Sequence, residues 1–188
     1  MEAMHKKWYQ NPEMIVGLSA LIVSLVAVFV GVYSASIDRA YARASVWPRL
    51  EIYRNYTQKK EDGKEAGSLL QYGVNNNGTG PAIIKYAKVT LDGKAVKNWA
   101  DLMKAVAGNA NQLNQSQING RTLPAQQSIT AFGTENQPFI KAWFGNEAKR
   151  LTIDLCYCSI YDECWATDIA NKPKPIPACP STADAFEQ

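Results

Sequence analysis

MIVGLSALIVSLVAVFVGVY, the sequence from Met14 to Tyr33, is a run of apolar and small residues without a single charge. The uncharged stretch continues as far as Ile37. A helix of about 20 residues extends about 30 Å, which matches the hydrocarbon core of a bilayer. The sequence therefore predicts a transmembrane helix over 14–37, preceded by an N-terminal tail over 1–13 and followed by a linker over 38–45.

A cleaved signal peptide is the alternative interpretation, because Ser34, Ala35 and Ser36 are small enough to suit a signal peptidase. The apolar run is longer than the roughly 7–15 residues of a signal peptide's hydrophobic region. We therefore expect a retained, single-pass anchor in the lipid bilayer.

Two signals disagree about the side of the membrane on which the C-terminal part lies. Two lysines precede the run, whereas four arginines follow it: Arg39, Arg43, Arg49 and Arg54. The positive-inside rule therefore favours a cytoplasmic domain. An even set of four cysteines near the C-terminus would instead suit disulfides in an oxidising compartment. We expect a cytoplasmic domain, and a periplasmic one stays open.

Beyond the run, short alternating segments are separated by turn residues. A short helix is predicted between Asn98 and Gly108, and a charged loop over 59–67. Strands are predicted over 46–55, 68–75, 82–91, 94–97, 127–132, 150–160 and 164–167. This pattern is typical of a mainly-β, antiparallel, immunoglobulin-like sandwich with one or two short helices, here over 46–168. The proline-rich segment 169–188 is predicted to be an extended tail.

Three motifs carry a resemblance to known proteins. They are WPRL from Trp47 to Leu50, VNNNGTGPA from Val74 to Ala82, and CYCSIYDECW from Cys156 to Trp165. Together they resemble a broad group of small bacterial proteins with one N-terminal transmembrane helix and a β-sandwich, which implies a bacterial inner-membrane location. The resemblance spans most of the chain, and its motifs are turn and hairpin features. In the second motif, Gly78 and Gly80 are expected to supply positive φ angles in a tight turn.

The architecture is also similar to that of transmembrane effectors in bacterial anti-phage systems. In the Hailong type, a channel-like effector is paired with a nucleotidyltransferase that makes DNA oligomers. This similarity implies an effector role in antiviral defence. It carries no binding residue onto this sequence.

Small residues form a stripe inside the apolar run, with alternating spacings of three and four. They are Gly17, Ala20, Ser24, Ala27, Gly31 and Ser34. This is the period of a left-handed helix bundle, and small residues let transmembrane helices approach closely. The stripe predicts a homo-oligomer whose helices pack along it. The alternative is a monomeric helix that is merely rich in small residues.

The same spacing, extended by one step in each direction, reaches Glu13 and Asp38. In a symmetric bundle these carboxylates would form two acidic rings at the mouths of a cation-conducting pore. Two alternatives stay open for this feature. The oligomer can be closed, or Glu13 can serve the helix N-terminus while Asp38 pairs with an arginine.

The cysteines are Cys156, Cys158, Cys164 and Cys179. Cys158 and Cys164 flank a five-residue turn, so they can face one another across a hairpin and form a disulfide. Small buried hydrophobic residues are the second interpretation. No metal site is expected, because the paired spacing of common zinc sites is missing.

The segment from Lys85 to Trp99 is rich in lysine. Lys85, Lys88, Lys94 and Lys97 lie there near Tyr86 and Trp99. Basic groups among aromatic rings suit a nucleotide or single-stranded oligonucleotide. A solvated hairpin face is the plainer interpretation, since the formal net charge of the chain is only +3.

An enzyme is not expected, because the only histidine, His5, lies in the N-terminal tail and no catalytic constellation or cofactor motif is found. We expect an oligomeric membrane effector, with a soluble sensor domain that binds a protein partner or nucleotide ligand and gates a cation channel. A membrane-tethered interaction or envelope-assembly module without conduction is the alternative.

Overall fold

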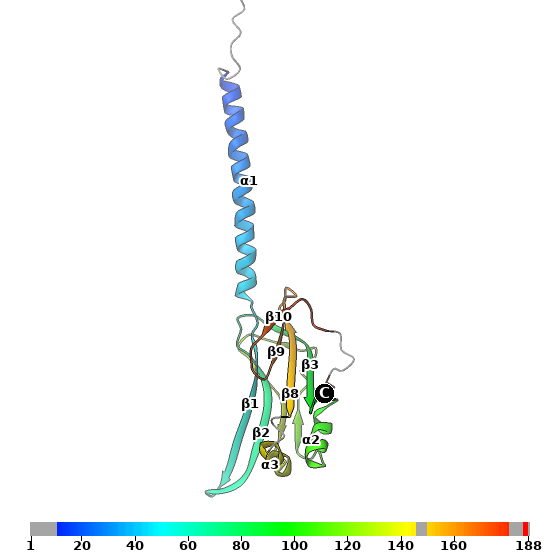
Figure 1. Cartoon of the computed structure of the whole chain (residues 1–188). Helices are drawn as coiled ribbons and strands as arrows, with labels where there is room; N and C mark the ends of the chain where they lie inside the picture. Colours follow the sequence, from blue (N-terminus) through cyan, green and yellow to red (C-terminus); the bar gives the residue numbers. More distant parts are fainter. Residues whose placement is uncertain (1–10, 146–149, 181–185, 188) are drawn as a thin grey trace, which may run out of the picture. The chain divides into compact units, whose positions relative to one another are not determined.

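The computed structural model describes residues 11–145, 150–180 and 186–187 (Figure 1). The chain divides into two compact units, 1–44 and 45–188, and each is described here by itself. Within the described residues, the first unit is one helix, and the second contains two antiparallel sheets and two short helices. The predicted combination of an apolar N-terminal helix and a mainly antiparallel β domain is confirmed.

Helix α1 runs from Pro12 to Ser45, and none of its residues is buried. It therefore includes the segment 38–45, which we predicted to be a linker. The correction has a local reason, because that segment combines alanines and arginines, which favour helix, and contains neither glycine nor proline. At the other end the helix begins within the predicted tail, of which residues 1–10 lie outside the described part.

The first sheet has the strand order β1-β2-β7-β5. Its strands are β1 (Leu50–Glu61), β2 (Lys64–Asn76), β5 (Leu113–Gln115) and β7 (Ser128–Thr134). The charged loop predicted over 59–67 is wrong, because β1 and β2 continue through it to a turn at Asp62 and Gly63. Both turn residues have positive φ angles, 51° and 77°. An Asp-Gly pair is a strong hairpin signal, so the charges decorate a hairpin instead of breaking it.

The second sheet has the strand order β10-β9-β8-β3-β4, with β6 also paired to β3. It comprises β3 (Ala82–Leu91), β4 (Lys94–Val96), β6 (Thr122–Leu123), β8 (Leu151–Cys158), β9 (Cys164–Asp168) and β10 (Lys174–Ile176). The predicted strands at 82–91, 150–160 and 164–167 are all present here. β10 was not predicted.

Two short helices accompany the sheets. Helix α2 (Trp99–Ala107) has the expected Asn98 cap, whose side chain accepts a hydrogen bond from the Asp101 N–H, and it ends at Gly108 with φ 74°. Helix α3 (Gln137–Gly145) was not predicted from the sequence. Figure 1 shows α3 beside the β1–β2 hairpin, which extends past the ends of the other strands.

The core lies between the sheets and is rich in aromatic rings. Phe132 packs against Trp99 with ring centroids 4.8 Å apart, and Phe139 stacks on Trp143 at 5.3 Å. Phe186, almost at the C-terminus, is 1% exposed and packs edge-on against Trp99 at 4.8 Å. Its backbone N–H donates to the Ala87 carbonyl at 3.0 Å.

The predicted extended tail over 169–188 is therefore wrong in its described parts. β10 pairs with β9, and Phe186 belongs to the core. Prolines do favour extended backbone, but they do not prevent a segment from pairing at a sheet edge or from burying a single aromatic residue. The sandwich thus extends well beyond the predicted boundary at Asp168.

The three resemblance motifs meet at one end of the sandwich. Asn76 is fully buried, and its amide donates to the carbonyl oxygens of Gly80 and Leu123 at 2.8 and 3.0 Å. The Thr79 N–H donates to the Trp47 carbonyl at 2.9 Å, and the Trp47 ring lies 6.4 Å from that of Trp165. We call this region, Trp47–Arg49 with Asn76–Gly80, the packed loop end.

The glycines of the packed loop end have a different role from the one we predicted. Neither Gly78 nor Gly80 has a positive φ angle. Instead, a Cβ atom at Gly80 would lie 1.9 Å from the Val46 carbonyl oxygen, and one at Gly78 would lie 2.3 Å from that of Trp47. These glycines are required because two backbone segments approach one another too closely for any side chain.

Candidate functional site

The small-residue stripe lies along one side of α1. With about 100° of rotation per residue, its six members and the two flanking acids fall within an arc of about 100°. Nothing lies within 4 Å of where a Cβ atom would be at Gly17 or Gly31. The stripe is therefore an open surface of the described helix.

Both acidic residues predicted to flank the stripe are inside α1, in the same arc as the stripe. Glu13 is in the first turn, whereas Asp38 lies two turns before the end at Ser45. The Ser24 hydroxyl donates to the Leu21 carbonyl within the helix at 2.7 Å. That bond satisfies the hydroxyl in an apolar setting, so the presence of Ser24 does not by itself require water beside the helix.

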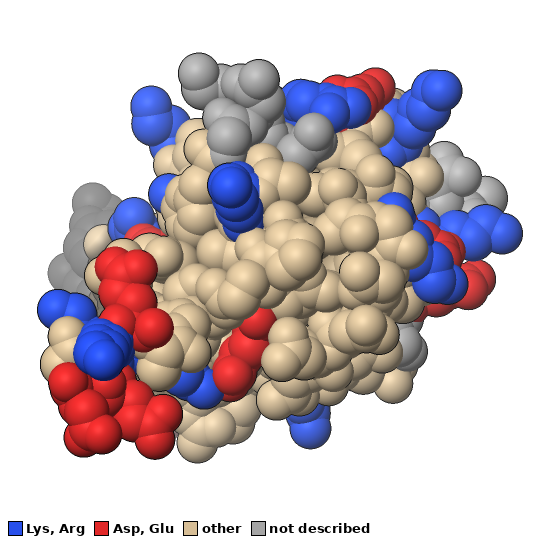
Figure 2. All heavy atoms as spheres, turned by 90° about the horizontal axis from the view of Figure 1, so that it is seen from below, with Lys and Arg blue, Asp and Glu red and all other residues tan. Residues whose placement is uncertain are grey.

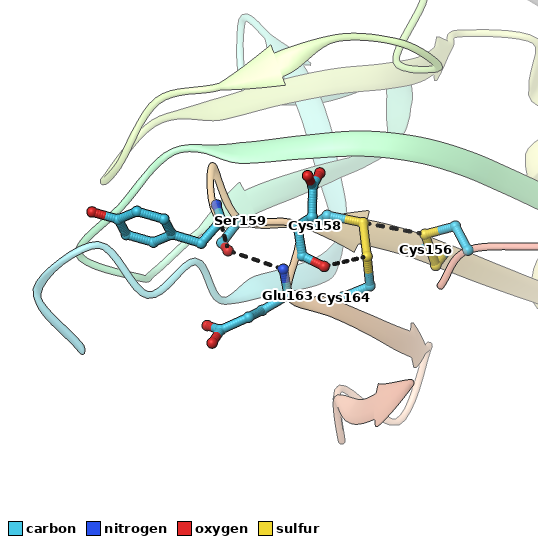
Figure 3. The surroundings of a disulfide bond; sticks show 8 residues. Cys156, Cys158, Ser159, Glu163 and Cys164 are labelled. Carbon is cyan, nitrogen blue, oxygen red and sulfur yellow. Dashed lines mark hydrogen bonds between the residues drawn. A yellow bond between two sulfur atoms is a disulfide. The ribbon is translucent and has the colours of Figure 1, made fainter. Parts of the chain in front are cut away.

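Two disulfides tie the C-terminal part of the sandwich to β8. Cys158 and Cys164 are bonded across the β8–β9 hairpin, as the spacing predicted, and Cys156 is bonded to Cys179 (Figure 3). The Cys156–Cys179 disulfide was not predicted, although an even number of cysteines leaves it as the remaining pair. The two bonds adjoin, because the Cys158 and Cys179 sulfur atoms are 3.7 Å apart. Sulfur atoms in this cluster thus serve as crosslinks.

The Ser159–Glu163 turn holds the β8–β9 hairpin in shape. The Ser159 N–H donates to the Glu163 carbonyl at 2.8 Å, and the Ser159 hydroxyl accepts hydrogen bonds from the Tyr161 and Glu163 N–H groups at 3.1 and 3.3 Å. This network, shown in part in Figure 3, fixes the two strands at the separation that the disulfide spans. The motif from Cys156 to Trp165 therefore has a structural role, which is to shape the β8–β9 hairpin.

Of the four lysines predicted to contact a ligand, Lys88 and Lys94 lie on opposite faces of the second sheet. Lys88 projects from the outer face of β3, where Asp154 lies opposite it on β8. Lys94 shares its face of β4 with Val96, which packs against the core. Lys85 lies at an irregularity in β3, and Lys97 follows β4. Strand alternation thus directs Lys88 and Lys94 to opposite sides, and we find no common binding site for these lysines in the described residues.

A groove lies between the β1–β2 hairpin and α3, and no predicted site residue lines it. Its volume is about 710 Å³, and its lining includes Tyr56, Ser68, Gln137, Lys141 and Phe144. The Tyr56 and Phe144 rings meet edge-on with centroids 4.7 Å apart, and both residues are more than 40% exposed. The Arg54 guanidinium lies 5.8 Å from the centre of the Phe144 ring.

The polar side of this groove is fixed by Gln137, at the start of α3. The Ser68 hydroxyl donates to the side-chain oxygen of Gln137 at 2.7 Å, and the side-chain amide of Gln137 donates to the Ser68 backbone carbonyl at 2.9 Å. These bonds hold α3 against β2. Tyr56 lies on β1, which pairs with β2, and Phe144 lies on α3. The bonds between α3 and β2 therefore also hold these two exposed rings together.

The end of the sandwich beside α2 and α3 has few charged side chains over a wide area. Figure 2 shows this face with a largely uncharged centre and with acidic and basic groups around its rim, including a cluster on the side where Figure 1 places the hairpin tip. Between Ala105 and Thr134 the sequence has a single charged residue, Arg121.

Strand β1 forms the edge of its sheet, and among the described residues side chains satisfy its outer backbone groups only at the start of the strand. The side-chain oxygen of Asn171 accepts from the Ile52 N–H at 2.7 Å, and the side-chain amide of Asn171 donates to the Ile52 carbonyl at 2.9 Å. A hydrogen bond also joins the Leu50 backbone to Tyr157. In this way two side chains close the edge as far as Ile52.

Burial changes the acidity of three groups in the sandwich. It raises the pKa of Tyr157, although the hydrogen bond to Leu50 opposes the shift. It also raises the pKa of Tyr72, opposed by the hydrogen bond that the Trp143 indole donates at 3.1 Å. The pKa of Asp154 is raised by partial burial and then by the neighbouring Asp168 carboxylate, while Lys88 lowers it. Both tyrosines are thus kept neutral and act as structural hydrogen-bonding groups.

Comparison with models of known protein families gives no match, and comparison with curated proteins gives none either. The resemblance to small bacterial membrane proteins and the similarity to anti-phage effectors stay expectations.

Proposed function

We propose that this chain is a single-pass membrane protein whose copies associate through α1 and whose β-sandwich senses a partner. The observation that carries the proposal is the stripe on α1. Small side chains occupy one arc of a helix that buries nothing within its own chain. Small residues allow close helix approach, and lipid alone does not require their segregation.

The experiment that tests this proposal is the oligomeric state of the full chain in detergent. Ser24→Leu should disperse the oligomer, because a large side chain holds the helix backbones apart. Phe29→Leu, on the opposite face, is the control and should leave the oligomer intact. If both variants keep the wild-type mass, or if the wild type is a monomer, the stripe is not an interface.

We further propose that the sandwich lies in an oxidising compartment, the bacterial periplasm. Two disulfides support this side of the membrane, because such bonds are rare in reducing compartments. The four arginines that favoured a cytoplasmic domain are weaker evidence, because two of them lie in the sandwich. Arg49 pairs with Glu51 at 3.1 Å, and Arg54 lies over Phe144, so both belong to the surface of the sandwich.

The charges that flank the helix are then two on each side, with Arg39 and Arg43 balancing the two lysines that precede it. We therefore favour the periplasmic orientation that the sequence left open over the cytoplasmic one. Labelling of intact and reduced cells with a membrane-impermeant maleimide tests this. Cysteines that react only after reduction support the proposal, whereas free thiols shielded by the inner membrane would contradict it.

Cation conduction through the helix bundle is the second candidate function. The observation that favours it is the position of Glu13 and Asp38, both helical and both in the arc of the stripe. Asp38→Asn should weaken cation preference in liposome flux measurements without dispersing the oligomer. A stable oligomer that passes no ions in any tested state would leave a membrane-tethered interaction module.

A role in anti-phage defence rests on the architectural similarity alone. Phage challenge of cells that express the wild-type chain or Ser24→Leu would test it. Equal protection by both chains would separate any defence role from helix association.

A further inference from the structure

The outer edge of β1 has an open segment directly after the part that the chain closes for itself. In an antiparallel strand, backbone N–H and C=O groups of alternate residues face the same side. Asn171 binds both groups of Ile52 from outside the sheet, so the backbone groups of Arg54, Tyr56 and Gln58 also face outward. Among the described residues, none forms a hydrogen bond with these outward groups.

The far end of the same edge is protected in another way. The register between β1 and β2 shifts between Lys59 and Lys60, and the tip beyond carries several charges. Bulges and lysines are the devices by which proteins prevent edge strands from pairing. The unprotected segment is therefore bounded on both sides and covers Arg54 to Gln58.

The side chains of this segment line the groove beside α3. Tyr56 and Gln58 are both among the lining residues, and Tyr56 meets Phe144 across the groove. A strand that paired with the β1 edge would place alternate side chains on the same face as Tyr56, next to these rings. Backbone pairing and a side-chain pocket thus occur at the same residues.

We propose that an extended peptide segment of a partner protein adds to β1 as an extra strand along Arg54–Gln58 and places an aromatic or branched apolar side chain in this groove. The inference rests on the proposed sensor role of the sandwich and names the chemistry of its partner. It does not depend on association of α1. Main-chain hydrogen bonds give affinity in this mode of recognition, and the groove gives specificity.

The charges around the groove favour acidic groups in the partner. Arg54 at one end and Lys141 in the lining are both exposed, and Glu65 is the single acid among the lining residues. Lys59 is already paired with Glu135. We therefore expect an apolar residue flanked by aspartate or glutamate, because these would pair with Arg54 and Lys141 at the rim.

The test uses the full chain in nanodiscs and a fluorescent eight-residue peptide. The peptide alternates valine with acidic residues around one central phenylalanine, and binding is followed by fluorescence anisotropy. Two N-methylated versions serve as matched probes, each blocking one of the two alternate sets of amides. We expect one version to bind like the parent peptide and the other to lose about tenfold or more in affinity, since backbone hydrogen bonds are lost on one side only.

Protein variants locate the site. Gln58→Pro removes an outward N–H without breaking the β1–β2 ladder, because proline is tolerated at such edge positions. We expect about a tenfold loss of peptide affinity for Gln58→Pro and less than about a twofold change for Gln58→Ala, which keeps the N–H. Phe144→Ala should weaken binding through the groove and gives a second test if Gln58→Pro folds poorly.

Several outcomes would overturn the inference. They are no saturable binding of the parent peptide, equal loss with both N-methylated versions, and binding that Gln58→Pro and Phe144→Ala leave unchanged. Self-association of the wild type that Gln58→Pro abolishes would assign the edge to a second copy instead. The two proposals can be tested separately. If Ser24→Leu is a monomer and still binds the peptide, the β1 inference holds without helix association.

Discussion

Helix α1 and the β-sandwich differ in where their apolar side chains find partners. The sandwich covers its own core, down to a phenylalanine two residues from the end of the chain. In α1 no side chain is buried, and residues such as Phe29 and Val32 are more than 65% exposed. The sandwich thus buries its large apolar side chains within itself, whereas α1 leaves its apolar side chains exposed; under our proposal a bilayer and, along the small-residue arc, other helices cover them.

The largest loss of stability is expected for Gly80→Ala in the sandwich, compared with the same change at Gly31 in α1. The added Cβ atom would overlap the Val46 backbone, so the packed loop end must move apart, at a cost of more than about 3 kcal/mol in the free energy of unfolding. Gly31→Ala in α1 adds the same atom where nothing lies within 4 Å. Urea unfolding, followed by tryptophan fluorescence, should show a large loss for Gly80→Ala and none for Gly31→Ala. Equal unfolding midpoints would contradict our account of this end.

Removal of the disulfides should have the next largest effect. Cys156→Ser with Cys179→Ser opens a loop between residues 23 apart, and Cys158→Ser with Cys164→Ser opens one between residues 6 apart. The chain-entropy model assigns about 3 kcal/mol to the longer loop and roughly 1 kcal/mol less to the shorter one. Thermal unfolding of the two double variants should rank them in this order. The reverse order would contradict the ranking by loop length on which this prediction rests.

The smallest effect is expected at Asp154, on the outer face of the second sheet. Its raised pKa means that folding penalises the charged carboxylate, so this penalty is absent below the ordinary value of 3.8 and appears as pH rises. Asp154→Asn should therefore be slightly more stable than the wild type at pH 7, with the difference vanishing near pH 3. Asp168→Asn, which removes the neighbouring charge, should show a smaller gain. A wild-type chain that is the more stable one at pH 7 would contradict this assignment.

The sequence was sufficient where local signals determine structure. The helix over the apolar run, the Asn98 cap with Gly108 and the neighbouring strands over 82–91 and 94–97 were all predicted correctly. It was insufficient where long-range packing decides. Nothing local distinguishes a glycine needed for close approach, such as Gly80, from one needed for a turn, and nothing local shows that Phe186 returns to the core.

The groove beside α3 was missed for a related reason. Its residues come from β1, β2 and α3, which are far apart in sequence, and the charged tip at 59–67 was interpreted as a loop. The Asp-Gly pair at its centre is the signal that could have extended the hairpin. For the stripe the opposite holds, because its period is visible in the sequence and the structure adds only that the helix continues to Ser45.

Cysteine crosslinking along α1 in native membranes tests the central claim most directly. Single cysteines are placed at each position from 16 to 34, and the native cysteines stay oxidised in their disulfides. We predict crosslinked dimers at stripe positions such as Gly17, Ser24 and Gly31, with minima at Val26 and Phe29. Uniform or absent crosslinking, or maxima on the Val26–Phe29 side, would show that the stripe is not where copies of this protein meet.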